Sequence, residues 1–346
     1  MSRPAGLFLN SFLAPFAPFL ERGDVTDLYV NQPGEVWLEG AAGSERHAVS
    51  QIDDAALWRL ARQVAAASDQ GINREHPLLA ATLPDGARIQ VCAPPATRGS
   101  VAIAIRKHMM PDLRLSDYVE SGALSRIGAR AAERRAEDGV LSALLDRGDV
   151  REFLSGAVRA RKTILISGGT GTGKTTFLNA LLKEAPAGER LLLIEDTPEI
   201  RIEQPNVVGL VAARGRLGEA SVNVADLVEA ALRMRPDRII MGELRGAEAL
   251  NWLRAVGTGH PGSISTLHAA STEGAVEQLA LMALMANTEL RRSELVDYVR
   301  GTVDVFVQLE RVGGERLVSE IVFDPRDDNR SSGGALVRLD RLRASR

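Results

Sequence analysis

Hydrophobic positions in the first part of the chain come in short runs that are separated by turn-forming residues. Gln32-Pro33-Gly34 and Pro84-Asp85-Gly86 each lie between two such runs, as expected of hairpins. Residues 53–67 differ, because their apolar side chains recur at helical spacing. The predicted strands cover residues 25–31, 35–39, 79–83, 88–93 and 101–106. We therefore expect a mixed α/β domain with mostly antiparallel strands over residues 1–108.

The pattern changes between residues 109 and 158. Arginines and glutamates dominate residues 125–138. Residues 116–124 fit a short helix, and apolar residues recur at helical spacing over 140–160. Alternating charges favour a solvent-exposed helix, and the other interpretation is a basic face that binds nucleic acid. We predict a helical linker over 109–158.

Apolar strands alternate with helical patterns after residue 158, which predicts a buried parallel sheet. The predicted strands cover 164–167, 191–194, 238–241 and 263–267, and the predicted helices cover 174–182, 224–234, 247–256 and 272–285. Residues 303–309 and 317–323 flank Gly313-Gly314 and predict a terminal hairpin. We expect this domain to cover 159–326 and a mobile tail to cover 327–346.

Composition narrows the class of protein. The net charge is −3, which argues against bulk binding to nucleic acid. The single cysteine, Cys92, excludes an intramolecular disulfide, and its apolar surroundings predict a buried, inert thiol. No apolar run is long enough to span a bilayer. Residues 7–20 are interrupted by Asn10, Pro15 and Pro18, so we expect an amphipathic helix packed on its own domain, with contact to a membrane surface as the alternative.

The first candidate functional motif is a glycine-rich turn that follows the apolar run 164–167 and precedes a helical pattern. This turn satisfies the spacing of a phosphate-binding loop in its required strand–loop–helix setting. Glycines let successive N–H groups point at phosphate oxygens, and the helix adds its positive end. Lys174 would reach the β- and γ-phosphates, and Thr175 would hold Mg²⁺. The nucleotide-binding residues are Gly168, Gly169, Thr170, Gly171, Thr172, Gly173, Lys174, Thr175 and Thr176.

Two later strands end in carboxylates. Glu195 ends the run 191–194, at the edge of a parallel sheet where ligands bind, and it could order Mg²⁺ or a water molecule. Residues 238–241 lead through Gly242 to Glu243, which resembles a Walker B strand with glycine in place of the usual aspartate. Glu243 is suited to polarise the water that attacks the γ-phosphate. Arg245 would stabilise phosphate charge, or else form a salt bridge that holds Glu243.

A glycine-rich stretch, Gly257 to Ala269, contains His260 and His268. Their separation is not a metal-ligand spacing, and no carboxylate or cysteine lies nearby. His268 follows a predicted strand, which would set it near the γ-phosphate as a sensor. The alternative is that His268 is a core or surface residue whose hydrogen bonds are satisfied locally and that has no role in the site.

Taken in this order, the four stretches resemble the secretion ATPase superfamily, and most closely the hexameric traffic ATPases of type IV secretion and conjugation systems. Residues 29–36 and 88–91 also resemble the amino-terminal domain of that family. The resemblance extends from about Leu7 to Pro325. It implies an α/β protein in which a PAS-like amino-terminal domain precedes a RecA-like ATPase domain.

The resemblance also implies function. It implies a motor that hydrolyses ATP with Mg²⁺ in a six-membered ring at the cytoplasmic face of the inner membrane, with the secretion channel and its coupling proteins as partners. Basic residues of the amino-terminal domain reach the phosphates in such rings, and Arg88 and Arg106 match best, with solvated strand edges as the alternative. The long linker leaves open whether each amino-terminal domain packs on its own ATPase domain or on a neighbour's.

Three other functions fit parts of the sequence. A pilus assembly or retraction motor, or a type II secretion ATPase, belongs to the same superfamily, but many pilus motors lack the Gly-His-Pro-Gly form of residues 259–262. A nucleic-acid translocase would need a basic channel with aromatic side chains, whereas aromatic residues are 4% of this chain. A nucleotide switch without hydrolysis is disfavoured by Glu243. We expect no sequence-specific binding of nucleic acid.

Overall fold

The computed structural model describes residues 5–108, 113–212, 219–324 and 337–340. The chain forms two compact units. The first contains Met1–Met109 and Ala187–Gly242, and the second contains Met110–Pro186 and Glu243–Arg346. Residues 187–242, which the sequence assigns to the ATPase domain, thus group with the amino-terminal part. Within the described residues, no helix has both the length and the apolar content to cross a membrane.

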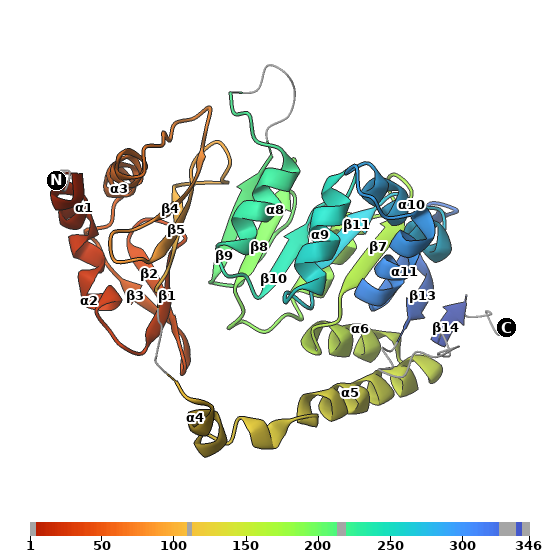
Figure 1. Cartoon of the computed structure of the whole chain (residues 1–346). Helices are drawn as coiled ribbons and strands as arrows, with labels where there is room; N and C mark the ends of the chain where they lie inside the picture. Colours follow the sequence, from red (N-terminus) through yellow and green to blue (C-terminus); the bar gives the residue numbers. More distant parts are fainter. Residues whose placement is uncertain (1–4, 109–112, 213–218, 325–336, 341–346) are drawn as a thin grey trace. The chain divides into compact units, whose positions relative to one another are not determined.

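An antiparallel sheet of six strands is the framework of the amino-terminal part of the first unit (Figure 1). Its order is β3-β2-β1-β6-β5-β4, formed by β1 (Val25–Val30), β2 (Glu35–Gly40), β3 (Gly43–Ala48), β4 (Leu78–Thr82), β5 (Arg88–Cys92) and β6 (Ala102–Arg106). All the strands predicted here are confirmed. The prediction missed β3, because its side chains are mostly exposed and carry no apolar alternation.

Helices cover the core of this sheet. They are α1 (Ala5–Leu13), the 3₁₀ turn η1 (Ala14–Phe16), α2 (Ala17–Leu20) and α3 (Asp54–Ala67). Asp53 caps α3 by accepting a hydrogen bond from the backbone N–H of Ala56. Leu9 and Phe16 lie buried in the same apolar core as Leu57, so the amino-terminal helix packs on its own domain as predicted.

The remaining strands of the first unit pair in parallel. Strand β8 (Leu191–Glu195) pairs in parallel with both β9 (Val207–Val211) and β10 (Arg238–Met241), and α8 (Val224–Leu232) precedes β10. Strands β8 and β10 and helix α8 match the predicted elements, whereas β9 was not predicted.

Arg190 ties the two sheets of this unit together. It is fully buried, with its guanidinium 4.0 Å from the centre of the Tyr29 ring, and it donates hydrogen bonds to Asn31 (2.7 Å), Asn206 (2.5 Å) and the carbonyl of Met234 (3.0 Å). Burial lowers the pKa of Arg190 to about 10, which still leaves it charged at neutral pH. A buried guanidinium is stable only with such partners, so it fixes how the segment 187–242 packs on β1.

The second unit contains the linker and the phosphate-binding loop. Its strand order is β14-β13-β12-β7-β11, where β7 pairs in parallel with β11 and β12 and the remaining pairs are antiparallel. The strands are β7 (Ile164–Gly168), β11 (Ile264–Leu267), β12 (Val305–Val312), β13 (Glu315–Phe323) and β14 (Val337–Asp340). The helices are α4 (Leu115–Glu120), η2 (Leu124–Arg126), α5 (Ala129–Asp146), α6 (Val150–Arg159), α7 (Lys174–Leu182), α9 (Glu248–Gly257), α10 (Thr272–Leu284) and α11 (Arg292–Thr302).

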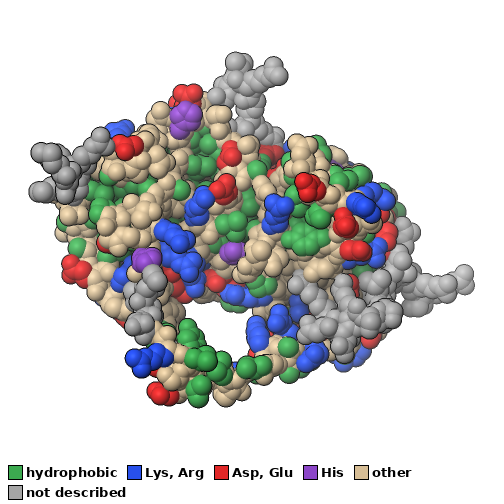
Figure 2. Space-filling model, viewed as in Figure 1, with side chains coloured by type: hydrophobic (Ala, Val, Ile, Leu, Met, Phe, Trp, Pro, Cys, Tyr) green, Lys and Arg blue, Asp and Glu red, His purple; other side chains and the backbone are tan. Residues whose placement is uncertain are grey.

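The described part of the predicted linker is helical, and a buried ion pair between Asp138 and Lys162 joins α5 to the segment before β7. Exposed apolar side chains gather around α4, where Leu115 and Val119 face solvent (Figure 2). Four residues of the expected mobile tail form β14, which pairs with β13. The other residues of that tail lie outside the described part of the chain, as do residues 109–112 of the linker.

Candidate nucleotide site

The glycine-rich loop connects buried β7 to α7 in the second unit. Two of its glycines are required by the geometry. A Cβ at Gly168 would lie 2.6 Å from the carbonyl oxygen of Leu309, and Gly173 has φ +92° where it caps the start of α7. Thr172 closes the loop by donating to the carbonyl of Gly169 at 2.9 Å. The strand–loop–helix setting that the sequence predicted is therefore confirmed.

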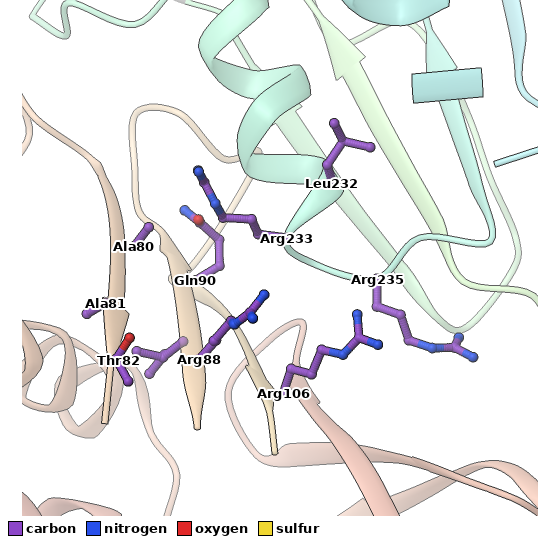
Figure 3. A pocket seen from close by; sticks show the side chains of 10 residues that line it. Ala80, Ala81, Thr82, Arg88, Gln90, Arg106, Leu232, Arg233 and Arg235 are labelled. Carbon is purple, nitrogen blue, oxygen red and sulfur yellow. The ribbon is translucent and has the colours of Figure 1, made fainter. Parts of the chain in front are cut away.

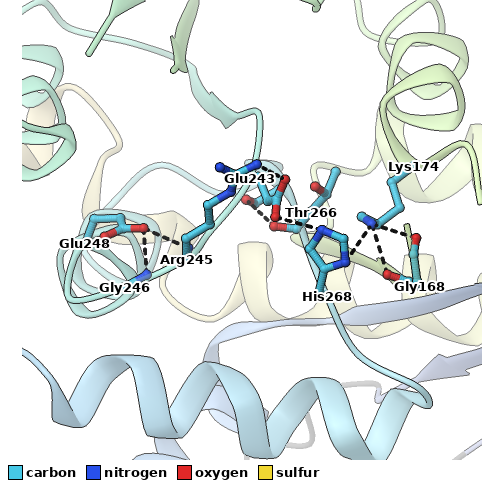
Figure 4. A network of polar contacts seen from close by, with 10 residues as sticks. Gly168, Lys174, Glu243, Arg245, Gly246, Glu248, Thr266 and His268 are labelled. Atoms are coloured by element: carbon cyan, nitrogen blue, oxygen red, sulfur yellow. Dashed lines mark hydrogen bonds and ion pairs between the residues drawn. The ribbon is translucent and has the colours of Figure 1, made fainter. Parts of the chain in front are cut away.

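Lys174 lies folded against this loop (Figure 4). Its amine donates to the carbonyl oxygens of Gly168 (2.9 Å) and Gly169 (3.1 Å) and lies 3.5 Å from Nδ1 of His268. Burial lowers the pKa of Lys174, and the charge of Glu243 opposes this shift. An ammonium held in this position is available to phosphate oxygens at the mouth of the loop.

Glu243 is the centre of the network in Figure 4. One carboxylate oxygen accepts from Arg245 at 2.9 Å, and the other lies 3.0 Å from Nε2 of His268. The Glu243 side chain is 19% exposed. Burial raises its pKa, but the hydrogen bond to Arg245 and the charges of Arg245, His268 and Lys174 outweigh burial, so the net pKa is lowered. Glu243 is therefore an ionised carboxylate at neutral pH.

The ends of two strands bring these groups together. The backbone N–H of Leu244 donates to the carbonyl of Thr266 at 2.8 Å, which places Glu243 beside the end of β11 and hence beside His268. Glu248 accepts from the N–H groups of Arg245 and Gly246 and so starts α9. Arg245 forms a salt bridge with Glu243, which is the alternative role predicted for it from the sequence.

The two histidines differ in their surroundings. His268 joins Lys174 to Glu243, whereas the ring of His260 lies 2.9 Å from the carbonyl of Ala255 in α9. His260 therefore supports the end of a helix, and His268 belongs to the candidate site.

Gln308 is a site residue that sequence reasoning missed. It is 2% exposed, accepts a hydrogen bond from Ser167 at 2.5 Å and donates to the carbonyl of Ala269 at 3.2 Å. It thereby links the residue before the loop to the residue after His268. The available signal was a single amide within the apolar run 303–309.

Glu195 lies in the first unit with partners of its own. Its Oε1 accepts from the backbone N–H groups of Glu199 and Ile200, both at 2.8 Å, and its other oxygen is paired with Arg98. Arg98 also donates to the carbonyl of Ile200 at 2.9 Å, and burial lowers its pKa. Sequence reasoning did not identify Arg98, because it follows the turn 94–97 outside any recognisable motif.

Arg88 and Arg106 both line a cavity in the first unit, which has a volume of about 310 Å³ (Figure 3). They are directly opposite each other on β5 and β6, and within the described part of the chain neither makes an ion pair. Arg233 and Arg235 also line this cavity, but they are paired with Glu229 and Glu39, respectively. Like charges opposite each other on neighbouring strands are unfavourable, so this cavity suits an anion.

The structure thus brings together Lys174, Glu243, Arg245 and His268 within the second unit. Thr175 and Thr176 follow Lys174 in the first turn of α7. Glu195, Arg88 and Arg106 lie in the first unit.

Comparisons with known proteins are consistent across sequence and structure. Residues 12–321 match the family described as type II/IV secretion system protein. The chain is 35% identical over 336 residues to the type IV secretion system protein VirB11 of Bartonella quintana, covering 93% of this chain and 94% of that protein. It is 40% identical over 303 residues to the type IV secretion system protein PtlH homolog of Bordetella bronchiseptica, and the match covers 86% of this chain and 89% of that protein.

A solved structure agrees with these relatives. The crystal structure of the VirB11 ATPase from the Brucella suis type IV secretion system, in complex with sulphate, superposes with a TM-score of 0.85 at 36% identity. The match covers 92% of this chain and 98% of that one. The expected fold class, an amino-terminal mixed α/β domain followed by an ATPase domain with a mostly parallel sheet, is confirmed.

Proposed function

The chain belongs to the type II/IV secretion system protein family, and we propose that it is an ATP-hydrolysing motor that drives substrate transfer or pilus biogenesis in a type IV secretion system. The observation that carries this proposal is the contact series from Lys174 through His268 to Glu243 beside the glycine-rich loop. It joins a phosphate-binding amine to an ionised carboxylate, which a hydrolase needs and a simple nucleotide-binding protein does not.

Binding of ATP would use the loop as a whole. Its backbone N–H groups and the positive end of α7 attract the phosphates, and the Lys174 amine would turn from the carbonyls of Gly168 and Gly169 to phosphate oxygens. We assign Mg²⁺ to Thr175 and Glu195, whose hydroxyl and carboxylate oxygens are the ligand type that this ion prefers. Because Arg98 and two backbone N–H groups already bind the Glu195 carboxylate, Glu195 would act on the ion through a water molecule.

Hydrolysis would proceed from Glu243. The carboxylate accepts a proton from a water molecule while the water oxygen bonds to the γ-phosphorus and the bond to the departing ADP breaks. Arg245 and His268 hold the carboxylate in place through its two oxygens. His268 also contacts Lys174, so it would sense whether the γ-phosphate is present. Release of phosphate and ADP would then let the domains move.

Other parts of the chain would complete a ring. Arg88 and Arg106 are the proposed phosphate contacts from the amino-terminal domain, supported by their lack of ion pairs among the described residues. We propose a hexamer that acts in the cytoplasm at the inner membrane with channel and coupling proteins. The proposed domains remain 1–108, 109–158 and 159–326, followed by the tail.

Complementation tests this function. Cells whose type IV secretion system lacks this protein should regain transfer when they express the unaltered chain, but not when they express Lys174→Ala. Lys183→Ala is a matched control, because Lys183 is an exposed lysine at the end of the same helix. Restored transfer with Lys174→Ala would contradict the proposal. A native mass of the purified protein with ATP checks the number of subunits.

A further inference from the structure

The hairpin of β12 and β13 contacts the glycine-rich loop at two points. The carbonyl of Leu309 occupies the space that a side chain at Gly168 would need. Further along, Nε of Arg316 donates to the carbonyl of Gly171 at 3.2 Å. A Cβ at Gly173 would lie 3.1 Å from Cδ of Arg316 and 3.7 Å from its Nε. The Arg316 side chain therefore lies along the loop where α7 begins.

No carboxylate of the described residues forms an ion pair with the Arg316 guanidinium. Throughout the described residues Arg316 makes no ion pair, and neither does Arg311, which is directly opposite it on the hairpin. Both arginines are exposed. Two cations opposite each other repel, and the positive end of the α7 dipole adds to this repulsion. A bound anion beside the loop would relieve it.

We propose that Arg316 is a nucleotide-binding residue that contacts the α- and β-phosphates, the ones that remain on ADP; this inference rests on the proposed function. Its guanidinium has five N–H donors, and the carbonyl of Gly171 takes only the one on Nε. The remaining donors form a fork that suits phosphate oxygens.

Position along the loop separates the role of Arg316 from that of Lys174. Lys174 lies against Gly168 and Gly169, next to the hydrolytic groups, whereas Arg316 lies against Gly171 and Gly173. Arg316 thus binds the part of the nucleotide that does not react. Such a contact strengthens ATP and ADP binding equally and leaves the chemical step unchanged.

The experiment compares Arg316→Ala with Arg311→Ala in the full chain. Kd is measured by titration with ADP and with ATP, and kcat by phosphate release at saturating ATP. Arg316→Ala should weaken both nucleotides by the same factor, about 10-fold to 100-fold, as for loss of a charge-assisted hydrogen bond. Its kcat should stay within about twofold. Arg311→Ala removes the same charge from the same hairpin without a loop contact and should change Kd by less than about threefold.

Salt gives a second readout. The difference in Kd between the unaltered protein and Arg316→Ala should shrink as NaCl rises, because an exposed charge contact is screened. An unchanged Kd in Arg316→Ala would overturn the inference. A fall in kcat at constant Kd would also overturn it, since Arg316 would then only brace the loop. If the unaltered protein binds neither nucleotide, the proposed function itself fails, which distinguishes the two failures.

Discussion

Replacing Glu243 by glutamine tests the hydrolytic assignment, because glutamine keeps the size of the side chain and removes its ability to accept a proton. The fold should tolerate this change. Glu243 is 19% exposed, and its partners Arg245 and His268 are 54% and 46% exposed, so the lost ion pairs contribute no more than about 1 kcal/mol to the free energy of unfolding. Glutamine can still accept from Arg245.

The Glu243→Gln change should lower the rate of ATP hydrolysis far more than it lowers the free energy of unfolding. A positioned general base contributes about 10²–10⁴-fold to a rate, which corresponds to about 3–5 kcal/mol of activation free energy. ATP should bind at least as tightly as before, because the change removes a negative charge from beside the phosphates. The change leaves the Lys174 amine available to bind the phosphates.

The assay combines two measurements on the same sample. The Kd for ATP comes from titration, and turnover comes from phosphate release at saturating ATP and Mg²⁺. Glu277→Gln serves as the control, because it neutralises an exposed carboxylate on α10 that pairs with Arg292. The control should hydrolyse ATP normally. Turnover by Glu243→Gln within about threefold of the unaltered protein, with ATP bound, would refute the assignment.

Three further outcomes are expected. Arg98→Ala leaves the buried Glu195 carboxylate with only its backbone partners and should lower the free energy of unfolding by about 2–3 kcal/mol, measured by urea denaturation; no change would mean that the ion pair is dispensable. Gln308→Leu removes the hydrogen bonds that link the loop to the segment after β11 and leaves their buried partners unsatisfied, so we expect kcat to fall and the free energy of unfolding to drop by about 1–3 kcal/mol; a normal kcat would count against that link. The lowered pKa of Glu243 predicts that its contribution to turnover and stability persists above its ordinary pKa of 4.5 and is lost only at lower pH. If turnover instead depends on a group that titrates near neutral pH, and Glu243→Asp shifts the pH of that titration, the prediction is contradicted.

Much of the fold could be predicted from periodicity. The strands of the amino-terminal sheet and the alternating elements after the loop carry regular apolar patterns, and they were found. Strand β3 was missed because most of its side chains face solvent, and β9 because a short apolar run does not by itself distinguish a strand. The polar sequence of α11 likewise gave a weak helical signal. The grouping of residues 187–242 with the amino-terminal part depends on long-range contacts such as those of Arg190, which local patterns do not contain.

The candidate site was predictable wherever chemistry followed a motif. Lys174, Glu243 and His268 each lie at the end of a strand or the start of a helix, so the sheet brings them together. Partners without a motif were missed. Arg98 meets Glu195, and Arg316 meets the glycine-rich loop, only because the chain folds back over more than 90 residues. Side-chain pairing across such distances is set by tertiary packing rather than by spacing.

Phosphate release from ATP by the full chain is the most direct test of the central claim that the loop, Glu243 and His268 form a hydrolytic site. The unaltered protein should release phosphate only when Mg²⁺ is present, and Lys174→Ala should abolish that release while the protein stays folded. Lys183→Ala should behave as the unaltered protein does. Normal release by Lys174→Ala, or none by the unaltered protein under any Mg²⁺ concentration, would contradict the account.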